Sequence, residues 1–184
     1  MKRVFLLTGP PGVGKTTVLL RAVGLIRQQK LSVGGMVTKE VRSRVTGARV
    51  GFELEDLATG RRGWLARAQA GPGPKIGRYL VDIRALEGVG ASAVLDAAAR
   101  SEVIAVDEIG PMELLSGAFR SAVVAAVESG KPLIATVHFR STDPLVVSLK
   151  ERCDAELFAV SVDNRGSMPG IISDRISELL GRIG

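Results

Sequence analysis

The sequence predicts an α/β fold of three layers, in which helices cover both faces of a mainly parallel sheet. Its 184 residues suit a single domain. Short apolar runs alternate along the chain with longer segments in which apolar residues recur every three or four positions. The runs at residues 103–106 and 133–137 carry no charge, as is typical of strands buried on both faces. Strands and helices that alternate in this way indicate a parallel sheet with right-handed crossovers.

Strands are expected where short apolar or alternating runs stop at glycine, proline or charged residues. In chain order they are residues 3–8, 33–40, 48–56, 62–68, 78–83, 103–106, 133–137 and 156–162. Residues 48–56 and 62–68 flank the turn Ala58-Thr59-Gly60, which predicts an antiparallel hairpin inserted on the parallel scaffold at about residues 45–70. Residues 71–74, which read Gly-Pro-Gly-Pro, are expected to form a long turn inside the single domain 1–184.

Helices are expected where the apolar spacing changes to that of a helix. The first, at residues 15–29, has an apolar side made of Val18, Leu19, Ala22, Val23 and Ile26. The others are expected at residues 92–99, which are rich in alanine, and at residues 114–129, 144–151 and 169–180.

Charge, cysteine content and hydropathy narrow the class of protein. The net charge of +6 comes from lysines and arginines that are spread along the chain without an interleaved stack of aromatic residues, so nucleic acid is not expected as the main partner. Cys153 has no second cysteine to pair with, which favours a reducing compartment and a cytoplasmic protein. No apolar stretch approaches the roughly 20 residues that a membrane helix needs. We expect a monomer that does not enter a membrane.

Residues 9–16 carry the most informative motif. They read Gly-Pro-Pro-Gly-Val-Gly-Lys-Thr, which matches the phosphate-loop pattern at every fixed position, between a predicted strand and a predicted helix. Glycines let the backbone wrap closely, so that several N–H groups converge on phosphate oxygens at a helix N-terminus. Lys15 adds a cation between the outer phosphates and is a catalytic candidate, and Thr16 offers a hydroxyl to Mg²⁺. The expected nucleotide contacts are Gly9, Pro10, Pro11, Gly12, Val13, Gly14, Lys15, Thr16 and Thr17.

Two carboxylates end the apolar strand at residues 103–106. Ligands gather at the carboxyl ends of parallel strands, so Asp107 is expected to hold Mg²⁺ directly or through water. Side chains alternate along a strand, so Glu108 is expected to point elsewhere and to polarise the attacking water. A glutamate at this position favours hydrolysis over transfer to a second substrate.

Further candidates follow the later strands. Thr136 lies near the end of the run at residues 133–137, and His138 lies just beyond it. Both are catalytic candidates that sense the γ-phosphate or orient water. Asn164 and Arg165 follow the last strand and are candidates for contact with the base. A cation on the developing charge assists phosphoryl transfer. The candidates for this arginine are Arg42, Arg44, Arg140 and Arg165.

Several of these segments occur together in a recognisable combination. The segments are residues 9–16, Gly-Gly-Met-Val-Thr-Lys-Glu-Val-Arg at 34–42, Gly-Phe-Glu-Leu at 51–54, Asp-Glu-Ile-Gly-Pro-Met-Glu-Leu at 107–114, and Asn164-Arg165. With them the chain resembles, over essentially its whole length, the small nucleoside-triphosphatase family of thermophiles, whose animal branch is called cancer-related nucleoside-triphosphatase. The resemblance implies a RecA-like core, Mg²⁺-dependent hydrolysis and broad tolerance of the base, with ATP, GTP, CTP and UTP or TTP as substrates. It also implies nucleotide contacts at residues 9–16 and around residues 103–110.

The leading hypothesis is therefore a P-loop phosphohydrolase that releases the γ-phosphate of nucleoside triphosphates. Two alternatives stay open. A nucleotide or nucleoside kinase needs a lid and an acceptor pocket, and its arginine-rich lid would be built from residues 42–67. A nucleic-acid-associated regulatory ATPase is motivated by the basic charge.

Overall fold

The computed structural model describes residues 1–68 and 73–181. Within this part of the chain, the strands form one sheet of nine, in the order β5-β6-β4-β3-β2-β7-β8-β1-β9. The strands are β1 (Val4–Thr8), β2 (Val33–Arg42), β3 (Arg49–Asp56), β4 (Arg62–Arg67), β5 (Lys75–Ile76), β6 (Tyr79–Val81), β7 (Val103–Ile109), β8 (Leu133–Val137) and β9 (Ala155–Ala159). The expected turn at residues 71–74 lies partly outside the described residues.

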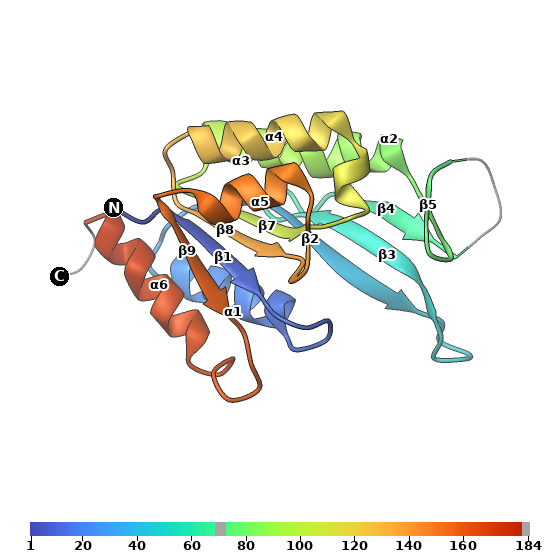
Figure 1. Ribbon diagram of the computed structural model, residues 1–184, viewed down its shortest axis with the longest axis horizontal. Helices are drawn as coiled ribbons and strands as arrows, with labels where there is room; N and C mark the ends of the chain where they lie inside the picture. The colour runs from blue at the N-terminus through green and yellow to red at the C-terminus, as the bar shows by residue number, and fades with distance from the viewer. Residues whose placement is uncertain (69–72, 182–184) are drawn as a thin grey trace.

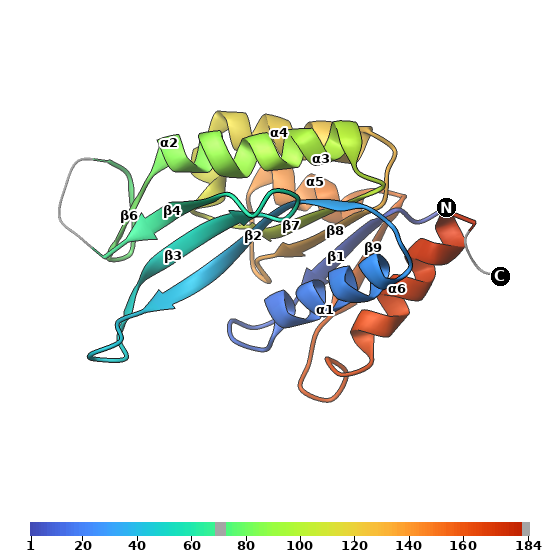
Figure 2. The same cartoon turned by 180° about the vertical axis from the view of Figure 1, so that it is seen from behind.

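Helices lie on both faces of the sheet (Figures 1 and 2). The α-helices are α1 (Lys15–Gln28), α2 (Ile83–Ala85), α3 (Ser92–Arg100), α4 (Gly117–Glu128), α5 (Pro144–Glu151) and α6 (Met168–Leu179). A π-helical turn (Leu86–Ala91) joins α2 to α3, and a 3₁₀ turn (Glu113–Leu115) precedes α4. Helices α3, α4 and α5 cover one face, and α1 and α6 cover the other, which confirms the predicted three-layer α/β architecture.

The core consists of two apolar layers, one on each face of the sheet. Alternate residues of β1 enter different layers: Val4 and Leu6 pack with residues of α4 and α5, whereas Phe5 and Leu7 pack with residues of α1 and α6. All four side chains are at most 1% exposed. A strand that is buried on both faces has no polar face, which explains its uninterrupted apolar sequence. No helix in the described residues is both long and apolar enough to cross a membrane.

The parallel half of the sheet positions the functional residues. Strand β8 pairs with β1 on one side and with β7 on the other, and β2 and β9 extend the parallel arrangement outward. The strand before the phosphate loop and the strand that carries the acidic pair are therefore separated by one strand. Their carboxyl ends nevertheless open on the same edge, where ligands bind in open parallel sheets.

The predicted antiparallel hairpin is present as β3 and β4. Strand β2 continues to Arg42, two residues beyond its expected end, and pairs with β3 in antiparallel register, as β3 does with β4. The result is an antiparallel extension of the same sheet, completed by β6 and β5. Ion pairs cross these strands, including Lys39–Glu55 at 2.7 Å and Arg62–Glu55 at 2.8 Å.

The largest error in the sequence-based prediction concerns residues 83–91. The expected strand at 78–83 is shorter, and helical structure begins at Ile83, where the Asp82 side chain accepts a hydrogen bond from the Ala85 N–H at 2.9 Å. Glycine lowers helix propensity, so Gly88 and Gly90 concealed the first turns. A Cβ on Gly90 would lie 3.0 Å from the sulfur of Met36 on β2, so a small residue lets this helical segment approach the sheet.

Gly35 gives a direct test of the contact between β2 and β7. It has φ of 113°, and a Cβ there would lie 2.0 Å from the carbonyl oxygen of Ala105. Gly35→Ala combines backbone strain with a steric clash, so we expect it to lower the free energy of unfolding by about 3 kcal/mol or more, measured by chemical denaturation. Gly24→Ala is the matched control, because it lies in α1 with open space around its Cβ. The control should be neutral or stabilising by up to about 1 kcal/mol. Equal stabilities for the two variants would contradict this packing.

Candidate active site

The phosphate loop lies between β1 and α1, and its backbone requires glycine at several positions. Gly9, Gly12 and Gly14 have φ angles of 150°, 76° and 109°, which L side chains rarely adopt. A Cβ on Gly9 would also lie 2.8 Å from the carbonyl oxygen of Val160. Gly14 precedes the first residue of α1, whose leading N–H groups lack partners within the helix. The loop thus has the backbone geometry of an anion site at a helix N-terminus.

The Lys15 side chain folds back over this loop. Its Nζ donates hydrogen bonds to the carbonyl oxygens of Gly9 at 3.1 Å and Pro10 at 3.3 Å. Burial raises the pKa of Asp107 and of Glu108, and the charge of Lys15 opposes that shift. Thr16, the next residue in the chain, donates a hydrogen bond to Asp107 at 3.2 Å.

Asp107 is the meeting point of three elements. Its Oδ1 accepts hydrogen bonds from the hydroxyl of Thr16 on α1 at 3.2 Å and from that of Thr136 on β8 at 2.5 Å. The residue is only 2% exposed, and burial raises its pKa to about 6, against the lowering effect of the Thr136 and Thr16 hydrogen bonds. Thr136 therefore lines the site, as expected from its place at the end of β8.

The donor set around Asp107 fits Mg²⁺. The candidate ligand atoms are a hydroxyl oxygen and carboxylate oxygens, the hard donors that Mg²⁺ prefers, and this ion usually retains several waters and binds substrate phosphates. Among the described residues, no group of three or more His, Cys, Asp or Glu side chains forms a metal cage. A cation at this position would thus rely on Thr16, Asp107, phosphate oxygens and water.

Asp107 and Glu108 line one cavity of about 310 Å³ at the end of β7. Ala105 enters the apolar layer of α1, and Asp107, two residues on, bonds to Thr16 of α1, as alternation along the strand predicts. The pairing of β7 with β8 becomes irregular between Val106 and Ile109, and a separate direction for the Glu108 side chain stays a prediction. Burial raises the pKa of Glu108, and the charge of Lys15 opposes that shift.

Sequence analysis assigned no role to Glu113, which lines the same cavity. It lies in the 3₁₀ turn after β7, is 4% exposed, and has its pKa raised by burial to about 8. A Cβ on Gly110 would lie 3.0 Å from Glu108 Oε1 and 3.1 Å from Glu113 Oε2, so glycine gives both carboxyl groups room. The available signal was that Glu113 is a third acidic residue in the run at residues 107–114.

His138 lies apart from this cluster. It lines a separate open cavity with Arg120 and Arg140, at the far side of the turn after β7. The Arg120 guanidinium is paired with Asp143 at 2.5 Å. Within the described residues, His138 shares no cavity with Asp107, and its catalytic role stays a prediction.

The late loop approaches the nucleotide site through Arg165. Its Nη1 donates to the carbonyl oxygen of Val13 at 3.3 Å. Asn164 instead stabilises its own turn: its amide donates to the Ala159 carbonyl, and its side-chain oxygen accepts from the Ser161 N–H, both at 2.8 Å. A contact of either residue with the base stays a prediction.

The remaining arginine candidates lie away from the loop. Arg42 pairs with Glu40 at 2.6 Å and donates to the Gly47 carbonyl, and Arg44 is exposed in the turn between β2 and β3. Thr17 is exposed on the first turn of α1. Of the four arginines proposed for the transition state, Arg165 is the one that contacts the phosphate loop among the described residues.

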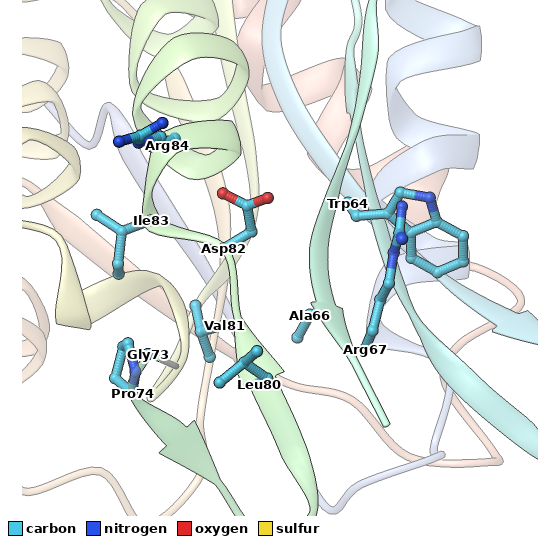
Figure 3. A pocket seen from close by; sticks show the side chains of 10 residues that line it. All are labelled: Trp64, Ala66, Arg67, Gly73, Pro74, Leu80, Val81, Asp82, Ile83 and Arg84. Atoms are coloured by element: carbon cyan, nitrogen blue, oxygen red, sulfur yellow. The ribbon is translucent and has the colours of Figure 1, made fainter. Parts of the chain in front are cut away.

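A second, larger cavity is lined by residues around β4 and β6 (Figure 3). It has a volume of about 470 Å³ and is lined by residues of β4, β6 and α2, including Leu80, Asp82 and Arg84. Beside it, the Arg67 guanidinium stacks 4.3 Å from the centre of the Trp64 ring. It includes no phosphate-loop residue, so the smaller cavity beside Asp107 is the candidate active site.

The site combines a phosphate loop with a buried aspartate at the end of β7 and a glutamate next to it. This combination defines a P-loop nucleotide-binding protein of RecA-like topology. Comparison with known proteins gives a narrower assignment. The sequence profile of a family described as NTPase matches residues 4–173, so the chain belongs to this family.

Relatives and solved structures agree with this assignment. The chain is 45% identical over 179 residues to nucleoside-triphosphatase THEP1 of Thermofilum pendens, with 97% of each chain covered. It is 44% identical to that of Methanopyrus kandleri, covering 94% of this chain and 92% of the relative. The crystal structure of THEP1 from Aquifex aeolicus superposes with a TM-score of 0.81 at 26% identity, covering 94% and 98% of the two chains. The solution structure of a human cancer-related nucleoside triphosphatase gives 0.78 at 32% identity, with both chains fully covered.

Glu113 makes the stability of the protein depend on pH. Its pKa is raised from an ordinary value of 4.5 to about 8, so the folded state binds the proton more tightly than the unfolded state. The stability that this group contributes is complete below about pH 4.5 and is lost as the pH rises towards 8. Glu113→Gln removes the titration. The quantity to compare is the free energy of unfolding of Glu113→Gln minus that of the parent protein. We expect this difference to be larger at pH 9 than at pH 5 by on the order of 3 kcal/mol.

Urea denaturation of the metal-free proteins at both pH values measures this difference. Glu151→Gln, at an exposed position on α5, is the control and should differ from the parent by less than about 0.5 kcal/mol at either pH. A Glu113→Gln difference that is the same at pH 5 and pH 9 would contradict a buried, proton-binding Glu113.

Proposed function

We propose that this chain is a Mg²⁺-dependent nucleoside-triphosphatase that releases the γ-phosphate and accepts ATP, GTP, CTP and UTP. Membership of the NTPase family supports hydrolysis of a nucleoside triphosphate. The observation that carries the rest of the proposal is the convergence of the Thr16 and Thr136 hydroxyls on Asp107 beside the phosphate loop. A site of action in the cytoplasm and a monomeric state are part of the same proposal.

The phosphate loop binds and orients the triphosphate. Backbone N–H groups of Gly12 and Gly14 and of the N-terminus of α1 face its oxygens, and Lys15 leaves the Gly9 and Pro10 carbonyls to bind the outer phosphates. Thr16 and Asp107 would hold a Mg²⁺ ion, which would neutralise charge on the outer phosphate oxygens. Thr136 acts through Asp107 as a positioning residue, because its hydrogen bond directs the carboxylate.

Glu108 accepts the proton of the attacking water. The water oxygen forms a bond to the γ-phosphorus, and the bond from that phosphorus to the bridging oxygen breaks, so that the electron pair leaves with the nucleoside diphosphate. The partly buried position of Glu108 raises its pKa, which makes it a better proton acceptor than an exposed carboxylate. The charge of Lys15 then stabilises the developing negative charge.

Broad base tolerance is supported by the contacts of the late loop. The polar atoms of the Asn164 side chain are already bonded within their own turn. Arg165 remains exposed beside the phosphate loop, and a guanidinium stacks on the face of any base without reading its hydrogen-bonding edge. Binding energy is then dominated by the triphosphate, which all four nucleotides share.

Phosphate release from a nucleotide panel tests the proposal. With Mg²⁺, we expect ATP, GTP, CTP and UTP to be hydrolysed with kcat/KM values within about tenfold of one another, because the site contacts mainly the shared triphosphate. Replacing Mg²⁺ with excess EDTA should lower the rate by roughly 100-fold or more. Full activity in EDTA would contradict the role of Thr16 and Asp107, and activity on one base alone would contradict base tolerance.

Two variants serve as controls for chemistry and for binding. Glu108→Gln keeps the shape of the side chain but removes the proton acceptor, so we expect kcat to fall by about 100-fold or more while nucleotide affinity stays within about threefold. Lys15→Ala should weaken both binding and turnover, because Lys15 contacts the phosphates throughout. Near-parental phosphate release by Glu108→Gln would remove Glu108 from the mechanism.

A further inference from the structure

The cavity beside Asp107 and Glu108 is larger than hydrolysis requires. Its volume is about 310 Å³, whereas one water molecule occupies about 30 Å³ of liquid. Thr16, Asp107 and Glu108 line one part of it, and Phe52, Leu65 and Ile76 of the antiparallel extension line another. The space therefore extends from the acidic pair to strands that the parallel core does not supply.

Part of the lining is apolar. It is made of Phe52 from β3, Leu65 from β4 and Ile76 from β5, and of Pro111 and Met112 from the turn after β7. Phe52 packs edge-on against Tyr79 at 5.1 Å between ring centres, which holds its ring in place. Apolar and aromatic walls with a few convergent polar groups are the usual lining of a small-molecule site.

The polar groups of the cavity include an unused hydroxyl. Thr38 Oγ1 is buried and has no hydrogen-bond partner within the described residues, although buried polar groups are normally paired. Thr38 follows Val37, which pairs with Asp107 across the β2–β7 ladder, so this hydroxyl lies next to the acidic pair. Thr38 belongs to the run at residues 34–42 that sequence analysis singled out and that hydrolysis does not explain.

The polar groups of the lining restrict what can bind. Glu40, Glu108 and Glu113 line the cavity, and Glu40 is paired with Arg42 and Arg49. No lysine or arginine is among the described residues that line the cavity itself. Carboxyl groups form hydrogen bonds with hydroxyl groups, so the lining favours an uncharged molecule with several hydroxyls and a flat apolar part.

We propose that this cavity binds a nucleoside and that a hydroxyl of the nucleoside replaces water as the phosphoryl acceptor. The proposal rests on the proposed function, since it uses the same phosphate loop and the same glutamate. The acceptor oxygen forms a bond to the γ-phosphorus, its proton moves to Glu108, and the bridging P–O bond breaks with its electron pair on the nucleoside diphosphate. The products are a nucleoside diphosphate and a nucleoside monophosphate.

The test follows label from [γ-³²P]ATP with the full chain, Mg²⁺ and adenosine, guanosine, cytidine, uridine or thymidine. Chromatography separates labelled free phosphate from labelled nucleoside monophosphate in the same sample. We expect labelled monophosphate with at least one nucleoside, in addition to free phosphate. Free phosphate without labelled monophosphate for all five nucleosides would overturn the acceptor site and leave hydrolysis standing. Neither product would overturn the proposed function as well.

Two tryptophan variants connect the transfer to the cavity. Ile76→Trp fills the cavity from its rim, and we expect the ratio of monophosphate to free phosphate to fall at least tenfold. Ile171→Trp makes the same change at an exposed position on α6 and should keep the parental ratio. Thr38→Val, which removes the unused hydroxyl, should raise the KM for the nucleoside while the KM for ATP stays within about twofold. An unchanged ratio in Ile76→Trp would locate the acceptor elsewhere and overturn the assignment.

Discussion

The hydrogen bonds from Thr16 and Thr136 to the Asp107 carboxylate hold the active site of this protein together. They join the first turn of α1 to β8 and β7, three elements that are far apart in the sequence. The position of β8 between β1 and β7 allows this, because Thr136 reaches Asp107 from the neighbouring strand while Thr16 reaches it from the helix that follows β1. A carboxylate that is 2% exposed is unfavourable without such partners, and its buried oxygens are suited to a hydrated cation.

Much of this arrangement could be predicted from sequence, for identifiable reasons. The phosphate loop is recognisable because its backbone angles demand glycine at Gly9, Gly12 and Gly14, so the geometry is written in residue types. The positions of Asp107 and Thr136 follow from a general rule, since parallel strands present their carboxyl ends to one edge. Asp107 directly follows the apolar run at residues 103–106, and Thr136 lies near the end of the run at residues 133–137. Uninterrupted apolar runs of this length predict central strands that are buried on both faces.

The features that sequence could not supply depend on local irregularity or on tertiary packing. Glu108 and Asp107 line one cavity at the point where the β7–β8 register is interrupted, and no residue type announces such an irregularity. Glu113 becomes a site residue through a 3₁₀ turn that returns it to the strand end. The helical segment that begins at Ile83 was not predicted because it contains glycines, which lower helix propensity. Gly90 lets this segment approach Met36 on β2, a contact that the sequence does not reveal. The roles assigned to His138 and Asn164 stay predictions, because their contacts in the described residues do not involve the Asp107 site.

The antiparallel extension links the fold to the question of substrate. It is continuous with the parallel core through β2, whose close contact with β7 at Gly35 brings Thr38 beside the acidic pair. One sheet thereby serves both the phosphate loop and the apolar walls of the cavity. The chain resembles its THEP1 relatives over nearly its full length, so this combination is part of the family domain rather than an appended module.

The central claim remains the pairing of the phosphate loop with Asp107 through a metal ion. A crystal structure with Mg²⁺ and a non-hydrolysable triphosphate tests it most directly. The account predicts the ion between Thr16 Oγ1 and the Asp107 carboxylate, with the γ-phosphate facing Glu108. An ion bound without contact to either residue, or a triphosphate bound outside residues 9–16, would contradict it.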